Sequence, residues 1–255
     1  MIYVHPIGGL GNMFFHIASI WALAKDNGDE LCLLNVERKI INLINDPRCD
    51  LKHAAKYQYI FDRFLNKNSN VTRRIGYPFN YVLLTYHNET EYVGYYQCEK
   101  YFKHRRTELL ELFKPTDEFV DEINNYEQLF GNISLHVRRG DYVGSIVHPE
   151  LSIKYYEEAL THLPEHMQVL VFSDDLKWCR ENFIGEKYVF IDEIDYISIY
   201  LMAKMKHHII ANSSFSWWGA WLSEHDDKKI IAPKNWFGAN TEYDGDLIPD
   251  NWVRI

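Results

Sequence analysis

The chain has 255 residues, with 27 Lys or Arg against 36 Asp or Glu, so its formal net charge is −9. This length corresponds to one large domain or two small ones, and an apolar share of 47% is ordinary for a globular protein. The acidic balance argues against a nucleic-acid backbone or an anionic membrane surface as partner, because both require a broad basic face.

The four cysteines are scattered without a C-x-x-C pair, which argues against a disulfide framework and against a clustered zinc site. The sequence contains no run of the roughly 18 apolar residues that a membrane-spanning helix needs, and its N-terminus lacks the basic region of a secretory leader. From these features we expect no transmembrane segment, and free thiols in the reducing cytoplasm.

Strands and helices alternate at the start of the chain, before the pattern blurs between residues 39 and 86. Pro115 then separates two helical stretches, because proline breaks helices. The elements expected in this half are strands at 2–6, 31–34 and 91–96, and helices at 12–25, 99–113 and 116–129.

Short, continuous apolar strands alternate with helices through the second half. Such strands are buried on both faces, so the alternation predicts an open, mostly parallel sheet with right-handed crossovers. The expected elements are strands at 132–137, 168–172, 188–192, 208–212 and 229–233, and helices at 152–163, 176–183, 196–206 and 215–224.

These elements predict an α/β protein of two lobes, residues 1–125 and 126–255, with a central cleft between them. Ligands of open α/β sheets lie beyond the carboxyl ends of the strands. Each turn from a strand into a helix is therefore a candidate site.

The first such turn, Gly8 to Asn12, is rich in glycine. Glycines let the backbone approach a ligand closely, and the helix N-terminus behind them offers N–H groups and the positive end of its dipole. The spacing matches neither the dinucleotide fingerprint nor a P-loop. A tight turn with close helix packing explains the same residues, so both interpretations stay open.

The second turn carries Arg138 and Arg139 after a strand that ends near His136. Arginine at a buried sheet edge needs an anionic partner, so two adjacent arginines suggest a phosphate or carboxylate ligand. The alternative is an internal ion pair such as Arg139 with Asp141, which we expect to hold for one of the two arginines.

The third turn contains Asp174 and Asp175. We expect one of these carboxylates to cap the following helix, and the other could accept hydrogen bonds from a base or ribose or bind a divalent metal. The two residues are adjacent and lack the D-x-D spacing common in metal-dependent glycosyl transfer.

The fourth turn places Ser213, Ser214 and Ser216 at the start of a helix, where hydroxyls, N–H groups and the helix dipole make a phosphate cradle. A plain serine N-cap is the alternative. Three tryptophans one turn apart on this helix are expected to pack in the core, namely Trp217, Trp218 and Trp221.

Other polar residues in the chain have simpler interpretations. His207, His208 and His225 lack the spacing of metal ligands, and we interpret them as a solvated helix end and a turn. The basic pairs at 73–74 and 105–106 are expected on exposed faces.

The four turns, in this order, resemble those of the α-1,2-fucosyltransferase family, inverting enzymes of the GT-B type. The likeness covers nearly the whole chain, and the matching segments are GGLGNMFFHIA, HVRRGDYV, VFSDD and IIANSSFSWWGAWL. The resemblance implies a GT-B-like fold of two Rossmann-like lobes. It also implies transfer of L-fucose from GDP-β-L-fucose to the 2-hydroxyl of a terminal β-galactoside, with the acceptor on the first lobe and the donor on the second.

The resemblance assigns roles residue by residue. Arg138 would contact the β-phosphate and stabilise the departing GDP, while Arg139 matches a second arginine of less defined, partly structural role. The glutamine that usually follows Asn12 in the family is missing here. The implied donor-binding set is His136, Arg138, Arg139, Asp175, Ser213, Ser214, Phe215, Gly9 and Gly11, and the implied catalytic set is Arg138, Asp141 and Asn12.

We expect no metal or other cofactor, because an arginine and a helix N-terminus stabilise the charge that grows on the leaving diphosphate. Asp141, His16 and His5 are the candidates for the general base. The expected partners are GDP-fucose and a galactose-terminated glycan. Alternatives are a GDP-sugar-binding protein without transfer activity, transfer of another GDP-linked deoxy sugar, and a different linkage such as α-1,3.

Overall fold

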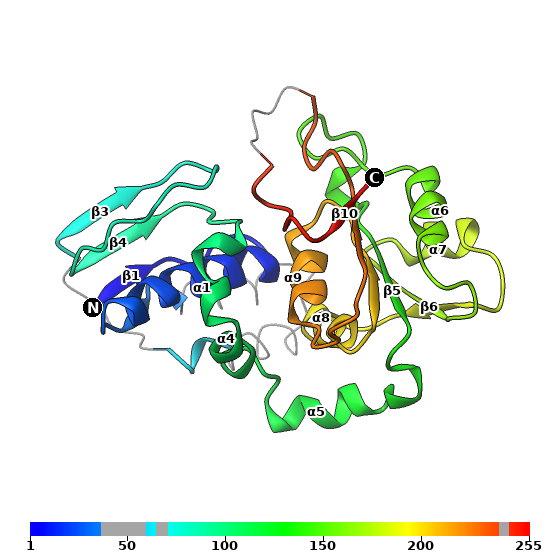
Figure 1. The fold of residues 1–255 in the computed structure, drawn as a ribbon, viewed down its shortest axis with the longest axis horizontal. Coiled ribbons are helices and arrows are strands. Elements are labelled where there is room, and N and C mark those ends of the chain that lie inside the picture. Colours follow the sequence, from blue (N-terminus) through cyan, green and yellow to red (C-terminus); the bar gives the residue numbers. More distant parts are fainter. Residues whose placement is uncertain (37–59, 65–70, 240–244) are drawn as a thin grey trace. The chain divides into compact units, whose positions relative to one another are not determined.

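The computed structural model describes residues 1–36, 60–64, 71–239 and 245–255. The chain forms two compact units, and each is described by itself (Figure 1). Unit 1 comprises Met1–Thr116 with Asp244–Pro249, and unit 2 comprises Asp117–Tyr243 with Asp250–Ile255. The division of the main chain thus falls after Thr116, whereas the predicted lobes meet at residue 125.

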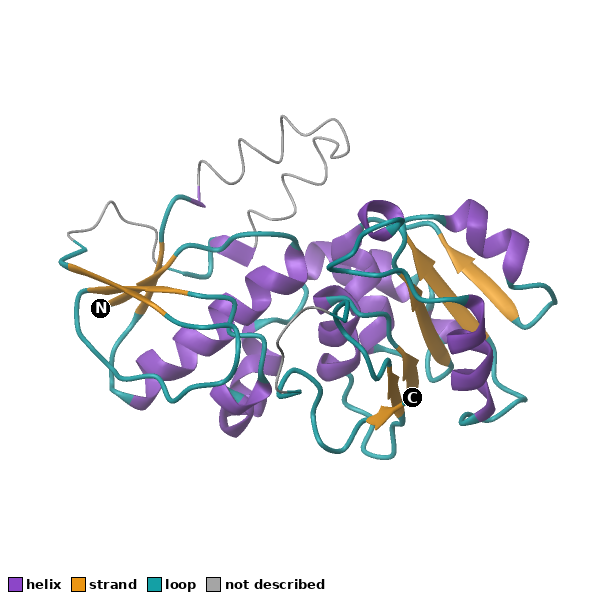
Figure 2. Ribbon diagram, turned by 90° about the horizontal axis from the view of Figure 1, so that it is seen from above, coloured by secondary structure: helices purple, strands orange, loops and turns teal. Residues whose placement is uncertain are grey.

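Unit 1 contains a four-stranded parallel sheet in the order β2-β1-β4-β3. The long helix α1 (Leu10–Asp26) leaves β1 through the glycine turn and is buried along most of its length, because apolar side chains occur on all its sides. Figure 2 shows helices of the unit in purple beside the orange strands. The strands are β1 (Ile2–Val4), β2 (Leu31–Leu33), β3 (Arg73–Gly76) and β4 (Thr90–Val93).

The helix predicted at 99–113 is broken at Phe102. There the backbone leaves helical values (φ −141°), and the fully buried ring lies 6.1 Å from that of Phe15. Burial of this aromatic ring therefore overrides the local helical pattern. The segment forms two 3-10 turns and one helix: η1 (Glu99–Tyr101), η2 (Lys103–Arg105) and α4 (Arg106–Leu112).

The basic pairs of unit 1 differ in exposure. Arg73 and Arg74 are exposed on β3, as predicted. The prediction is wrong for the pair at 105–106, which is half-buried. Arg105 pairs with Asp26 at the end of α1 at 2.6 Å and with Glu108 at 2.7 Å, so it ties α4 to α1.

Unit 2 is built on a six-stranded sheet in the order β10-β9-β8-β5-β6-β7, and all five neighbouring pairs are parallel. This confirms the predicted α/β class and the parallel sheet of the C-terminal lobe. The strands are β5 (Ile133–Val137), β6 (Val169–Ser173), β7 (Tyr188–Ile191), β8 (His207–Ile209), β9 (Ile230–Ala232) and β10 (Val253–Arg254).

Helices cover both faces of this sheet, with α6 and α7 on one side and α8 and α9 on the other (Figure 1). The sequence pattern placed these four helices to within a few residues, whereas the stretch predicted at 116–129 is split. The helical segments of unit 2 are α5 (Asp117–Asn124), η3 (Glu127–Leu129), η4 (Gly140–Tyr142), α6 (Ile153–Thr161), α7 (Leu176–Asn182), α8 (Asp195–Ala203) and α9 (Ser214–Leu222).

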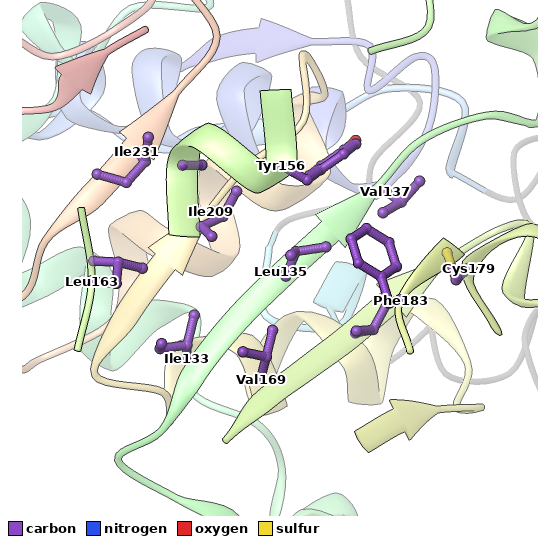
Figure 3. Close-up of a cluster of buried hydrophobic side chains, with 12 residues drawn as sticks. Ile133, Leu135, Val137, Tyr156, Leu163, Val169, Cys179, Phe183, Ile209 and Ile231 are labelled. Atoms are coloured by element: carbon purple, nitrogen blue, oxygen red, sulfur yellow. The ribbon is translucent and has the colours of Figure 1, made fainter. Parts of the chain in front are cut away.

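The core under α6 and α7 follows from the period-two alternation of β5. Ile133, Leu135 and Val137 point to the same face and are buried with Tyr156 of α6 and Phe183 after α7 (Figure 3). On the opposite side, Trp217, Trp218 and Trp221 of α9 are buried, which confirms that they pack in the core.

The interpretation of His207 and His208 as a solvated helix end is wrong. Both side chains are buried on β8, where His208 Nδ1 lies 2.8 Å from Ser134 Oγ of β5. Burial lowers the pKa of His208 well below its ordinary value, so the ring is neutral. A neutral imidazole with a hydroxyl partner is compatible with a central strand, whereas a charged one is not.

Helices α8 and α9 meet at Gly219, where an added Cβ would lie 2.8 Å from Met202 Cβ. Alanine gains up to about 1 kcal/mol of helix propensity, but overpacking costs roughly 1–3 kcal/mol. We expect Gly219→Ala to lower the free energy of unfolding by about 1–2 kcal/mol in urea denaturation. Gly76→Ala, whose Cβ would have no atom within 4 Å, is the near-neutral control. An unchanged unfolding midpoint for Gly219→Ala would contradict the close packing.

Candidate active site

The turns after β5, β6 and β8 lie at one edge of the sheet of unit 2, because parallel strands end at the same edge. From β5 the chain proceeds to β6 and β7, then returns to the other side of β5 for β8, β9 and β10. The order therefore reverses between β5 and β8, and open α/β sheets bind ligands at such a switch point. The predicted motifs at 138–142 and 212–215 follow these two strands.

Arg138 lies between two carboxylates. Its Nη2 donates to Asp141 Oδ1 at 2.5 Å, and its Nη1 pairs with Asp174 Oδ2 at 3.0 Å. The side chain of Asp141 is 63% exposed and that of Asp174 is 26% exposed. Because solvent screens exposed ion pairs, Asp141 is the weaker partner.

Arg139 is held by the protein itself. Its Nε donates to Asp175 Oδ2 at 3.2 Å, its Nη1 pairs with Glu150 Oε2 at 2.5 Å, and its guanidinium lies 4.4 Å from the ring centre of Trp178. The alternative pair of Arg139 with Asp141 is wrong: the 3-10 turn η4 brings Asp141 to Arg138, three residues before it.

Asp174 connects the turns after β5 and β6. Its Oδ1 accepts the backbone N–H of Arg139 at 2.9 Å, while its Oδ2 pairs with Arg138. A Cβ on Gly140 would lie 2.5 Å from this same Oδ2, so a glycine at 140 leaves room for the carboxylate. From the sequence, either Asp174 or Asp175 could cap the helix or bind a ligand, and the resemblance implied Asp175 for the donor site. In the structure it is Asp174 that contacts Arg138.

Asp175 caps α7, as expected for one of the two carboxylates. Its Oδ1 accepts the backbone N–H of Trp178 at 3.0 Å, while its Oδ2 accepts from Arg139. Asp175 therefore braces the site through Arg139.

Two contacts join the turns after β5 and β8. The rings of His136 and Phe215 lie 5.5 Å apart, and the Tyr142 hydroxyl donates to the carbonyl of Asn212 at 3.2 Å. These contacts bring the amino end of α9 to the arginine turn.

The serines of this turn have different roles. Ser213 is the buried N-cap residue of α9, and within the described residues its hydroxyl makes no capping hydrogen bond. Ser214 is half-buried. Ser216 donates backwards to the carbonyls of Ala211 and Ser213, so its hydroxyl serves the fold.

His136 is buried on β5, and its ring is neutral. Burial lowers its pKa to about 3, with a smaller contribution from the positive charge of Arg138. A neutral imidazole can accept or donate a hydrogen bond without adding charge beside the arginines.

Gly9, Gly11 and Asn12 belong to unit 1, where Gly9 precedes α1 as its N-cap residue. Asn12 Oδ1 accepts from Gln97 Nε2 at 2.7 Å, so an amide reaches Asn12 from a distant segment although no glutamine follows it in sequence. Among the candidate bases, His16 is fully buried, with its Nδ1 accepting the Ile7 N–H at 3.3 Å, and His5 is half-buried. Burial argues against His16 as the base.

Within the described ranges, no helix has the length and apolar character needed to cross a membrane. In the same part of the chain, His, Cys, Asp and Glu side chains do not gather in threes that could hold a metal ion.

The family model described as Glycosyl transferase family 11 matches residues 1–255. The chain belongs to this family. The membership confirms the resemblance seen in the sequence motifs and establishes a glycosyltransferase of fucosyltransferase type.

Three relatives of this family 11 protein differ in the reactions for which they are named. The alpha-1,2-colitosyltransferase of Escherichia coli is 36% identical over 65% of this chain, and the match spans only 62% of that relative. The O-antigen biosynthesis glycosyltransferase WbnK of Escherichia coli is 28% identical over 97% of this chain and 98% of its own length. Galactoside alpha-(1,2)-fucosyltransferase 2 of Sus scrofa is 25% identical over 86% of this chain and 69% of its own length.

We expect Gly140→Ala to reduce glycosyl transfer by roughly 10- to 100-fold, since the new Cβ displaces Asp174 and a catalytic group misplaced by about 1 Å loses that much. Initial rates measure the effect, and circular dichroism confirms the fold. Gly76→Ala is again the control. Wild-type turnover in Gly140→Ala would show that the position of the Asp174 carboxylate does not determine that of Arg138.

Burial of His136 and His208 predicts a pH-dependent stability. Below the ordinary histidine pKa of 6.5, both histidines are protonated in the unfolded chain but stay neutral in the folded protein. For His136 this difference persists down to about pH 3. The free energy of unfolding should therefore fall as the pH falls below 6.5, by roughly 1.4 kcal/mol per pH unit for each histidine. Urea denaturation at several pH values measures this slope. In His136→Gln the slope should shrink by one histidine's share, and parallel curves for the two proteins would contradict the assignment.

Proposed function

We propose that this family 11 glycosyltransferase is an inverting enzyme that moves L-fucose from GDP-β-L-fucose to the 2-hydroxyl of a terminal β-galactoside. One observation carries the proposal: the Arg138 guanidinium, held at the switch point beside the amino end of α9, with one exchangeable carboxylate partner. The relative named galactoside alpha-(1,2)-fucosyltransferase 2 supports the sugar, the linkage and the acceptor. The cytoplasmic location expected from the sequence stays a prediction.

The charges around Arg138 indicate how a diphosphate would enter. Two arginines face four carboxylates here, Asp141, Asp174, Asp175 and Glu150, which leaves a net charge of −2. A further anion binds favourably only if Arg138 exchanges one carboxylate for a phosphate. Asp141 is the partner to lose, because an exposed pair contributes about 0–1 kcal/mol. Asp174 would stay, since it also accepts the Arg139 N–H.

In the proposed reaction the acceptor 2-hydroxyl attacks C1 of fucose as the bond from C1 to the β-phosphate oxygen breaks. The electron pair of that bond leaves with GDP, so negative charge grows on the diphosphate. Arg138 would stabilise this charge together with the amino end of α9, at Ser213, Ser214 and Phe215. One such preorganised donor contributes about 3 kcal/mol to the transition state. For this reason we propose no metal cofactor.

The proton of the acceptor hydroxyl needs a base. We propose Asp141, because the exchange that brings Arg138 to the phosphate releases this exposed carboxylate in the same step. His136 and, through Arg139, Asp175 would border the guanine site. Gly9, Gly11 and Asn12 of unit 1 would bind the sugars.

A second donor is favoured by one specific observation. The 36% identical relative is named for transfer of colitose, which is L-fucose without its 3-hydroxyl. The arginine site would hold either diphosphate equally well. We therefore propose GDP-colitose as the alternative donor, and the kcat/KM ratio of the two donors decides between them.

The test is transfer from GDP-fucose to a panel of β-galactosides in EDTA, with NMR of the product linkage. We expect an α-1,2 product from the wild-type protein and a loss of about a hundredfold or more in Arg138→Ala. Arg138→Lys keeps the positive charge but loses the bidentate geometry of the guanidinium, so its transfer rate should lie between those of the wild-type protein and Arg138→Ala. Wild-type turnover in Arg138→Ala would overturn the role of Arg138. GDP binding without transfer to any acceptor from either donor would favour the non-transferring binding protein.

A further inference from the structure

The segment after β4 turns sharply at Tyr96. This residue has φ of +53°, a left-handed conformation that bulky side chains rarely adopt. Its buried ring packs edge-on against Tyr101 at 5.8 Å and against His16 at 6.3 Å. Such strain persists only where the surrounding structure enforces it, and it gathers at binding and catalytic sites.

The strained turn sends its two neighbours in different directions. Tyr95 stays 45% exposed, with its ring 6.2 Å from that of His16 and 6.1 Å from that of Phe79. Gln97 is buried and donates from Nε2 to Asn12 Oδ1 at 2.7 Å. The turn thus presents one exposed aromatic ring, that of Tyr95, and one buried amide, that of Gln97, which reaches Asn12 on α1.

The Gln97 bond orients the amide of Asn12. Since Asn12 Oδ1 accepts from Gln97, its Nδ2 faces Gly8, where an added Cβ would lie only 2.6 Å away. Gly8 has φ of +76°, so this close approach also requires glycine. Asn12 and His16 are one helical turn apart on α1, which places the amide and the Tyr95 ring over the same part of the helix.

These side chains suit a neutral sugar better than a diphosphate. A hexopyranose has a face of C–H groups that packs on an aromatic ring, and its hydroxyls both donate and accept, as carboxamides do. Tyr95, Gln97 and Asn12 carry no charge, whereas the arginine turn of unit 2 carries the groups that an anion needs.

We propose that Tyr95, Gln97 and Asn12 form the acceptor subsite, with the C–H face of the galactopyranose on the Tyr95 ring and its hydroxyls on the Asn12 amide. Gln97 acts as a positioning residue through Asn12. The proposal rests on the proposed function in taking a β-galactoside as the acceptor.

The test compares the effect of each substitution on the KM for the acceptor with its effect on the affinity for GDP. In Tyr95→Ala we expect the KM for a β-galactoside to rise about tenfold, while the Kd of GDP, measured by calorimetry, changes less than twofold. Tyr95→Phe keeps the ring face and should recover most of the lost affinity. Leu83→Ala, an exposed apolar residue of the same unit, controls for a general surface effect.

Gln97 has its own test, because a positioning role predicts a different pattern. Gln97→Glu sets a carboxylate oxygen against Asn12 Oδ1, so the Asn12 amide must turn and the KM for the galactoside should rise. Gln97→Ala removes the donor and should raise this KM less. The side-chain 15N signal of Asn12 should shift in both variants, whatever the activity.

A rise in galactoside KM without a change in GDP affinity supports the subsite. An unchanged galactoside KM in Tyr95→Ala, or an equal loss of GDP affinity, overturns it. If the wild-type protein transfers no sugar, the proposed function fails on its own. The subsite is then tested by NMR line broadening of methyl β-D-galactopyranoside: loss of broadening in Tyr95→Ala supports it, and equal broadening in both proteins overturns it.

Discussion

The carboxylate of Asp174 is the constraint on which the arginine site depends. It accepts a backbone N–H from one strand's turn and pairs with the guanidinium that the same turn presents, so it fixes both the turn and its charged group. Gly140 leaves the space that this carboxylate occupies. Arg139 is held by Asp175 and Glu150, whereas the most exposed of the four carboxylates, Asp141, is a partner of Arg138 and is the one that we propose a ligand replaces. One side chain in the turn after β6 therefore fixes the arginine turn and, in the proposed mechanism, holds Arg138 in place.

The negative net charge of the chain excludes fewer ligands than it first suggests. A net charge of −9 argues against extended polyanions, which need a wide basic face. A compact diphosphate needs only one guanidinium that can exchange a partner and a helix amino end, which in the proposed site would be Arg138 and the start of α9. We propose that the surplus of local carboxylates makes phosphate binding at Arg138 an exchange of one anionic partner for another. In the proposed mechanism that exchange also provides the base, since the phosphate that draws Arg138 away releases Asp141.

The sequence predicted the parts of the molecule that depend on local pattern. Continuous apolar strands predicted the sheet of unit 2, and the turns that follow them predicted the place of Arg138 and of the α9 amino end. Features set by distant contacts were missed. Histidine is a polar residue type, yet His208 is buried in the core, where its ring contacts a serine on the neighbouring strand. The roles of two adjacent aspartates depend on backbone direction at the end of β6, and the contact of Gln97 with Asn12 joins residues 85 positions apart.

A crystal structure of the protein with GDP tests the central claim most directly, because it shows which partner Arg138 exchanges. The account predicts that the guanidinium contacts the β-phosphate and has left Asp141. It also predicts that Asp174 still accepts the Arg139 N–H and still pairs with Arg138. A complex in which Arg138 keeps its bond to Asp141 while the β-phosphate binds elsewhere would contradict the account.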